Sequence, residues 1–147
     1  MSNLSSKFGA LLETYNVRVQ TPVPVDEVER QLAQLNANFP DLREFYAFTN
    51  GLDKDWFRVF PLEDKSNLKK TWDSLGRAND PAKTRYLREH AELLDSFLVF
   101  AEISGGNCAL LDRNDKSIWY QDQGLHQTDM SLIDLLQAEF LEVSEIA

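Results

Sequence analysis

The side chains that most often carry out covalent chemistry are few in this sequence. It holds two histidines, His90 and His126, and one cysteine, Cys108. A serine or cysteine nucleophile needs a base beside it, and that base is usually a histidine. His90 falls within a predicted helix, where a packing or surface role is expected, and His126 falls in a polar loop. Cys108 begins a predicted strand and is expected to be a small buried hydrophobe. These residues predict no nucleophilic catalysis.

Metal and phosphate sites are not predicted either. No pair of cysteine or histidine residues has the spacing of a zinc site. Residues 112–116 begin like a calcium loop, but Ser117 stands where that loop needs glycine and Gln123 where it needs glutamate. Gly105-Gly106 lacks the Lys-Ser/Thr pair of a phosphate-binding loop and is explained by a hairpin turn. We therefore expect neither metal nor cofactor.

Carboxylates are numerous, and for that reason they carry little information. The chain has 24 acidic residues, and any two of them can be paired by assumption as the acid and base of a hydrolase. The acids considered for such a pair are Glu13, Asp53, Asp55, Asp112 and Asp122. No spacing singles out one pair, so the chain is expected not to be an enzyme.

The net charge of −9 favours a particular kind of partner. Phosphate backbones repel such a surface, so direct nucleic-acid binding is not expected. A basic protein would instead be attracted and steered toward it. Solubility alone also explains an acidic surface. The sequence does not define the oligomeric state.

Two short acidic and aromatic stretches are the predicted partner-binding residues. The set is Asp53, Asp55, Trp56, Asp112, Asp115 and Trp119. The first three follow a predicted tight turn and are expected at an exposed tip, where the tryptophan anchors a partner and the aspartates steer it. The last three come from a second hairpin and are expected to form a neighbouring patch. The alternative is that both tryptophans cover the edge of the core and the aspartates form turns.

The first third of the chain is predicted to be helical. Apolar spacing predicts a helix over residues 4–15, and two prolines keep residues 21–25 extended. Asp26 is expected to be the N-cap of the next helix. A third helix begins with proline at a tolerated first position and runs over residues 39–49. Asn50-Gly51 is expected to end it, with the glycine at positive φ.

The remainder is predicted to contain most of the sheet. A short strand over residues 57–60 precedes a charged helical insertion around residues 64–96, broken near residues 76–81. An antiparallel meander is expected from Phe97–Ile103, Cys108–Leu111 and Ser117–Gln121. A C-terminal helix, capped by Ser131 and Asp134, is expected to dock through Leu132, Leu135, Leu136, Phe140 and Leu141. Phe45 and Phe100 are expected in the core.

These elements define the fold class. We expect one α+β domain over residues 1–147, with a small antiparallel sheet flanked by helices. The single cysteine is typical of a reducing compartment, and neither a signal peptide nor a membrane span is recognisable. A cytoplasmic location is therefore expected.

Several of these segments, taken in order, resemble the SUKH superfamily. The stretch 39–51, Phe-Pro-Asp-Leu-Arg-Glu-Phe-Tyr-Ala-Phe-Thr-Asn-Gly, is similar to its proline-started helix ending in Asn-Gly, preceded by a helix with a glutamate such as Glu29. Phe60-Pro61-Leu62 resembles its next strand and turn, and residues 97–120 its central hairpins. Residues 130–136 resemble its closing helix, so that the likeness covers roughly residues 26–141. The insertion at 64–96 departs from the pattern.

The resemblance implies a non-enzymatic protein-binding module. Many bacterial members resemble immunity proteins that bind and neutralise toxins of competing cells, often nucleases. An acidic chain fits a basic toxin domain as partner. The alternative is an intracellular regulator or scaffold of the same superfamily, such as the eukaryotic regulators of cell-wall synthesis and signalling.

Overall fold

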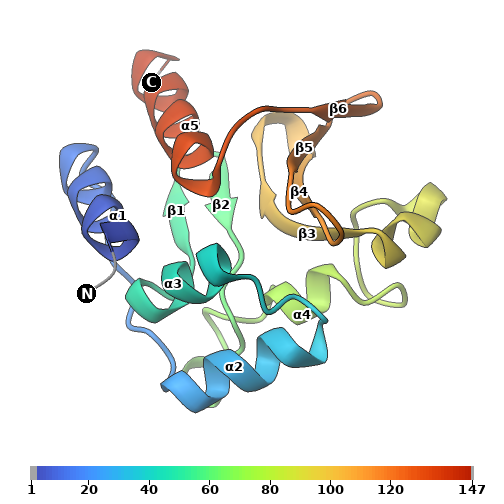
Figure 1. Cartoon of the computed structure of the whole chain (residues 1–147), viewed down its shortest axis with the longest axis horizontal. Coiled ribbons are helices and arrows are strands. Elements are labelled where there is room, and N and C mark those ends of the chain that lie inside the picture. The colour runs from blue at the N-terminus through green and yellow to red at the C-terminus, as the bar shows by residue number, and fades with distance from the viewer. Residues whose placement is uncertain (1–2, 147) are drawn as a thin grey trace.

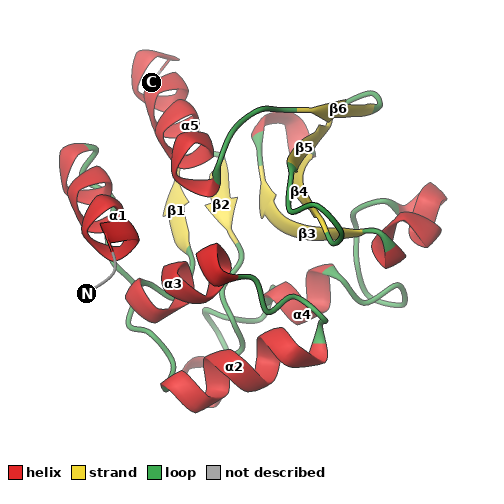
Figure 2. Cartoon of the chain, viewed as in Figure 1, coloured by secondary structure: helices red, strands yellow, loops and turns green. Residues whose placement is uncertain are grey.

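The computed structural model describes residues 3–146 and shows an antiparallel sheet surrounded by helices (Figures 1 and 2). The α-helices are α1 (Asn3–Thr14), α2 (Val25–Gln34), α3 (Pro40–Phe48), α4 (Leu75–Ala78) and α5 (Leu132–Ile146). The strands are β1 (Leu52–Lys54), β2 (Phe57–Val59), β3 (Phe97–Glu102), β4 (Cys108–Asp112), β5 (Ile118–Gln121) and β6 (Leu125–Gln127). Three short 3-10 helices are η1 (Lys65–Asn67), η2 (Arg88–Asp95) and η3 (Ser104–Gly106).

The sheet is a meander in which each strand pairs antiparallel with the next, in the order β1-β2-β3-β4-β5-β6. This confirms the predicted α+β class and the three central strands. The sequence did not indicate β1 and β6, the two edge strands, because each has three residues and exposes polar side chains. A bulge interrupts the pairing of β3 with β4 between Val99 and Ala101.

Aromatic side chains join the helices to each other and to the sheet. Phe45 of α3 meets Phe8 of α1 edge-on at 5.5 Å, and Phe140 of α5 meets Phe57 of β2 at 5.8 Å. Phe45 and Phe100 are fully buried, as predicted. In α5 the residues Leu132, Leu135, Leu136 and Phe140 are buried, again as predicted. The inclusion of Leu141 was wrong: it is 47% exposed, and Val143, three residues after Phe140, takes the inward position.

The predicted helix boundaries have mixed outcomes. Pro40 begins α3, and Ser131 and Asp134 bond each other's backbone N–H groups at the start of α5, as predicted. Gly51 has φ +78°, as predicted, although α3 already ends at Phe48 and Thr49 is extended. Asp26 is not an N-cap, because α2 begins one residue earlier, after Pro24, and Asp26 lies inside its first turn.

The prediction that residues 64–96 are helical was largely wrong. Only α4, with four residues, is α-helical there; η1 and η2 are 3-10 turns, and His90 has non-helical angles inside η2. Local side-chain bonds stabilise short turns in this segment, as when Asp64 accepts the N–H of Ser66 and caps η1. A left-handed residue, Leu87 at φ +55°, redirects the chain before η2.

Three buried or nearly buried amides fix the chain around β2 and β3, and we call them the amide clamps. Each side chain accepts a backbone N–H and donates to the C=O of the same residue. Gln31 holds Glu63, Asn50 holds Leu62 and Asn79 holds Val99, with donor–acceptor distances of 2.8–3.0 Å. The first two clamps anchor the chain after β2 to α2 and to the end of α3. The third anchors the end of α4 to the bulge of β3.

Candidate protein-binding surfaces

The residues that could carry chemistry are dispersed. Cys108 is buried in β4, and burial raises the pKa of its thiol to about 12, with a smaller contribution from the Glu102 carboxylate. A thiol with that pKa is a poor nucleophile at neutral pH. His90 does not face inward as a helix residue: its side chain is 66% exposed. His126 lies in β6, and its Nε2 is 2.9 Å from the backbone oxygen of Asp122. Among the side chains that the structure describes, no group of three His, Cys, Asp or Glu could hold a metal ion.

The predicted exposed tip at residues 53–56 is a β-hairpin. Asp53 lies in β1, and its carboxylate accepts a 2.5 Å bond from Arg58. Asp55 is exposed at the turn, at φ +53°. Trp56 is half-buried against the core, not exposed, and its indole N–H is buried without a hydrogen-bond acceptor among the described residues. Leaving such a group unpaired costs about 1–3 kcal/mol. The tip is thus exposed at Asp55, and for Trp56 the structure favours the alternative that its ring covers the edge of the core.

The second predicted group lies in the β4–β5 hairpin and has clear structural roles. Asp112 accepts the backbone N–H of Asn114 at 2.8 Å, and Asp115 accepts the N–H and hydroxyl of Ser117 at 2.9 and 2.6 Å. Both aspartates are thus turn-forming residues. Trp119 is half-buried and packs edge-on against Phe97 at 5.5 Å.

The strand register places the two predicted groups at opposite ends of the sheet. Arg58 pairs with Glu102, so the β1–β2 turn lies at the end where β3 finishes. The β5–β6 turn lies at this same end, since Gln121 pairs with both Cys108 and Leu125. The β4–β5 turn lies at the other end. Asp112, Asp115 and Trp119 therefore do not form a patch beside Asp55 and Trp56, because antiparallel pairing places successive turns at alternate ends.

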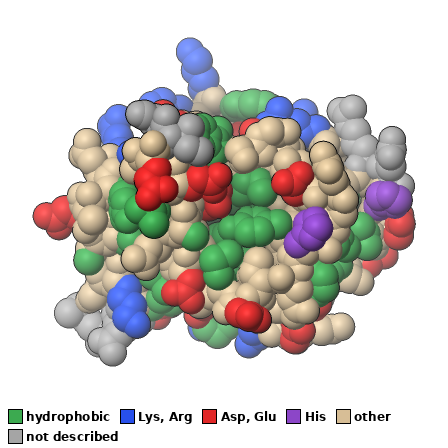
Figure 3. Space-filling view, turned by 90° about the horizontal axis from the view of Figure 1, so that it is seen from above, with side chains coloured by type: hydrophobic (Ala, Val, Ile, Leu, Met, Phe, Trp, Pro, Cys, Tyr) green, Lys and Arg blue, Asp and Glu red, His purple; other side chains and the backbone are tan. Residues whose placement is uncertain are grey.

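The negative charge of the protein is concentrated at its C-terminal end. Residues 117–147 contain six carboxylates and no Lys or Arg. Five of them are exposed: Asp122, Asp129, Asp134, Glu142 and Glu145. Figure 3 looks down on α5 and β6, and acidic side chains are spread around a hydrophobic area there, with Lys and Arg toward the rim. We call the surface of β5, β6 and α5 the acidic face.

One member of this group, Glu139 of α5, is buried. Its side chain is only 6% exposed, and its Oε2 accepts a bond of 3.3 Å from the hydroxyl of Tyr120. Burial, followed by repulsion from Glu142, raises the pKa of the Glu139 carboxyl above its ordinary value. No Lys or Arg of the described residues forms an ion pair with it. The acidic face therefore overlies a buried carboxyl group that forms no ion pair with any described Lys or Arg.

The β1–β2 turn adjoins the acidic face. Phe57, the residue after Trp56, contacts Phe140, which lies between Glu139 and Glu142 on α5. Asp55 and Trp56 are thus the predicted binding residues that the fold brings to this surface. Asp53 faces a different hollow, where it pairs with Arg58.

A second surface, which the sequence analysis missed, surrounds Trp72. This side chain is 63% exposed, and among the described residues it is the aromatic one of the large hydrophobic side chains left exposed. It lines three adjoining hollows of about 560, 460 and 190 Å³. Its sequence context, Lys69-Lys70-Thr71-Trp72-Asp73, was the available signal, since an aromatic residue among polar neighbours has no apolar stripe to join. The helical interpretation of 64–96 concealed it.

No helix among the described residues is long and apolar enough to cross a membrane. Comparison with known proteins identifies the family of the chain. No curated protein sequence matches the chain. The family model described as SMI1/KNR4 family (SUKH-1) matches residues 22–142, most of the chain and nearly the range over which the SUKH resemblance was recognised. The protein therefore belongs to the SMI1/KNR4 family (SUKH-1).

Proposed function

We propose that this protein is an immunity protein that binds a basic toxin domain, such as a nuclease, and neutralises it without catalysis. Family membership supports an immunity or regulatory role in general. The observation that carries the finer proposal is the acidic face, to which residues 117–147 contribute five exposed carboxylates and no Lys or Arg. A domain that binds nucleic acid is itself basic, so its binding surface is complementary to this face.

The acidic face has the composition of a surface that steers and then holds a basic partner. Asp122, Glu142 and Glu145 are exposed and would act at a distance through their charge. Asp55 and the half-buried Trp56 adjoin α5 and would provide close contact. The buried Glu139 lies beneath these exposed carboxylates and is not itself a contact residue. Asp112 and Asp115 lie at the β4–β5 end of the sheet, and Trp119 of β5 is half-buried against Phe97, so this arrangement does not require them.

The proposal implies a cellular location for the protein, and one other function competes with it. A toxin-neutralising protein would act in the cytoplasm, where an incoming nuclease meets its substrate. The alternative is a regulatory or scaffold protein of the same family. Its partner would be a host protein, and the chain's gene would not adjoin a toxin gene.

The test uses a toxin domain encoded beside the gene of this protein. We expect co-expression to rescue growth, and the purified proteins to associate more slowly as salt rises. Glu142→Lys should reduce the association rate roughly threefold or more at low salt, because it reverses an exposed charge on the acidic face.

Glu29→Lys is the matched control. Glu29 is also exposed in a helix, α2, and its reversal changes the net charge by the same amount. Figure 1 shows α2 at the bottom of the molecule and α5 at the top. Equal slowing by the two variants would show that only the total charge matters. Rescue that persists without any binding would exclude neutralisation by direct capture.

A further inference from the structure

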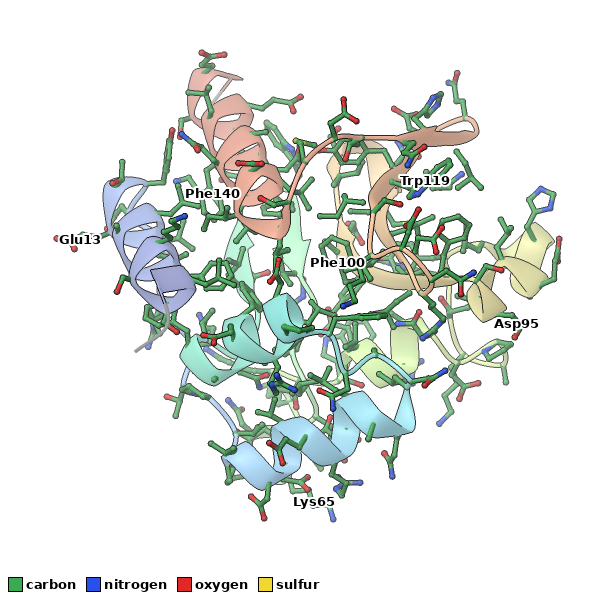
Figure 4. The ribbon with its side chains drawn as sticks, in the orientation of Figure 1. Glu13, Lys65, Asp95, Phe100, Trp119 and Phe140 are labelled. Carbon is green, nitrogen blue, oxygen red and sulfur yellow. The ribbon has the colours of Figure 1, made fainter. Side chains whose placement is uncertain are left out.

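The positive charge of the protein is concentrated as strongly as its negative charge, but elsewhere. Residues 65–85 contain six bases, Lys65, Lys69, Lys70, Arg77, Lys83 and Arg85. They contain two acids, Asp73 and Asp80, so this stretch has a net charge of +4 in a protein of −9. Figure 4 places Lys65 at the opposite end of the molecule from Phe140 of α5. The basic stretch therefore begins far from α5.

Most of these bases have no acidic partner among the residues that the structure describes. Arg58, Arg30 and Arg85 are used internally, in ion pairs with Asp53 and Asp73, with Glu27, and with Glu102. The four bases Lys65, Lys70, Arg77 and Lys83 make no ion pair with any described residue. They line the two larger hollows on either side of Trp72.

Trp72 joins the hollows and is exposed to solvent. The guanidinium of Arg77 lies over its ring, 5.7 Å from the centroid, which holds one cation against an aromatic face. Trp72 and the nearby Leu68, 55% exposed, are among the few large hydrophobic side chains left exposed. A tryptophan in that setting is typical of an interface anchor. We call this surface, formed by Trp72 and the four bases around it, the Trp72 surface.

We infer that the Trp72 surface binds an acidic segment of a partner protein, in which carboxylates flank an aromatic or large apolar side chain. The apolar side chain would pack on the Trp72 ring, and the carboxylates would enter the hollows beside Lys70, Arg77 and Lys83. The hollows are lined mainly by polar groups. Such a lining suits a peptide that alternates charged and apolar side chains better than an enclosed apolar ligand.

A peptide is favoured over nucleic acid by the acids in the same surface. Glu63 and Asp80 line the second hollow, and Asp64 and Asp73 line the first. These carboxylates would repel the closely spaced phosphates of a nucleic acid, as would the net charge of −9. An acidic peptide has fewer charges and can place them beside the four unpaired bases. The partner of this surface would differ from the basic toxin, because the Trp72 surface is basic whereas the face proposed to bind the toxin is acidic.

The segment around Trp72 is held in place before any partner binds. The amide clamps of Gln31 and Asn50 fix residues 62 and 63, and that of Asn79 fixes the end of α4. Arg58 further ties the segment to β1 and β2 through Asp73, with bonds of 2.6 and 2.7 Å. A surface fixed in this way loses little conformational entropy when it binds.

The test measures fluorescence polarisation of a labelled synthetic peptide in which glutamates flank one phenylalanine. We expect saturable binding that weakens as salt rises. Trp72→Ala should weaken it roughly tenfold, and so should replacing the phenylalanine of the peptide by serine. Lys83→Glu should weaken it as well, because it reverses a charge in the second hollow. A short single-stranded oligonucleotide serves as the competing polyanion.

Lys7→Glu is the control for net charge, since Lys7 is exposed on α1 and lines none of the three hollows. It should leave peptide binding unchanged. Urea unfolding of Trp72→Ala checks that the variant is folded. Absence of saturable peptide binding, tighter binding of the oligonucleotide, or an unaffected Trp72→Ala variant would each overturn the inference. None of these results bears on the toxin proposal, which is tested at Glu142.

Discussion

Gly51 is expected to be the least replaceable glycine of this fold, and Gly106 offers an internal control. The two have nearly equal backbone angles, φ +78° and +76°. They differ in what a side chain would meet. A Cβ at position 51 would lie 2.6 Å from the backbone oxygen of Val59 and 2.9 Å from the nitrogen of Pro61. A Cβ at position 106 would have no neighbour within 4 Å.

The expected losses of stability follow from two costs, that of the left-handed backbone conformation and that of the steric clash. An alanine in the left-handed region costs roughly 1–2 kcal/mol, and this cost is common to Gly51→Ala and Gly106→Ala. The gain from restricting the unfolded chain is common to both as well. Only position 51 adds a clash, and overpacking costs about 1–3 kcal/mol. We expect Gly51→Ala to lose about 1–3 kcal/mol more than Gly106→Ala, because the other two contributions are common to both variants.

The atoms that crowd Gly51 have little freedom to move. Val59 is paired with Leu52 on one side and Ala101 on the other, and Pro61 precedes the clamped residues 62 and 63. The clash therefore cannot be relieved without disturbing the sheet or a clamp.

The assay is urea unfolding followed by tryptophan fluorescence and, independently, by far-UV circular dichroism, with both variants compared to the parent at equal slope m. Losses that agree within about 0.5 kcal/mol at the two positions would refute the steric argument, leaving only the cost of the left-handed conformation. A Gly51→Ala variant that is stable but fails to bind its partner would make this glycine functional.

Three further predictions use the same measurement. Asn50→Ala should cost about 2–5 kcal/mol, because it leaves the buried N–H and C=O of Leu62 unpaired; a loss below about 1 kcal/mol would show that the clamp is dispensable. Glu139→Gln should raise the free energy of unfolding at neutral pH, because burial holds the pKa of the native carboxyl above that of the unfolded chain and its ionisation opposes folding. That gain should shrink as the pH falls toward about 4, and a pH-independent gain would contradict it. Trp56→Phe should cost less than Trp119→Phe by about 1 kcal/mol, because the first removes an unpaired N–H and the second breaks a bond to Ser117; the reverse order would contradict this.

The strands with the longest apolar runs were predictable, and the segment between β2 and β3 was not. Phe97–Glu102 is buried over its first five residues, so its apolar run identifies it directly. Within 64–96, the spacing of Tyr86, His90 and Leu93 or Leu94 favoured helix, but besides local bonds the chain there is held by side-chain bonds between residues distant in sequence. Asn79 bonding Val99 is one example. Periodicity contains no information about such bonds.

The sequence predicted what kind of site to expect, but not which residues form it. Net charge and the absence of a catalytic group pointed to protein binding, and the family match supports it. The residues of the binding surface were harder to predict, because the exposure of a side chain depends on tertiary packing. Trp56, next to a turn, folds onto the core, whereas Trp72, placed in a predicted helix, is exposed. Antiparallel register then separated the two hairpins that the sequence suggested as neighbours.

The two charged surfaces arise from different parts of the chain, and this bears on how their functions can vary. The acidic face is built by β5, β6 and α5, whereas the Trp72 surface is built by the segment between β2 and β3. The clamps of Gln31, Asn50 and Asn79 attach that segment to α2, to the end of α3 and to β3, and none of them involves α5. Changes in residues 65–77 can therefore alter one surface while the packing of α5 on β2 stays intact. Because sites that share no contacts contribute to stability independently, Trp72→Ala combined with Glu142→Lys should change stability by the sum of the single effects. The same additivity in partner binding would establish that the surfaces act separately, and a departure from it would reveal one partner that spans both.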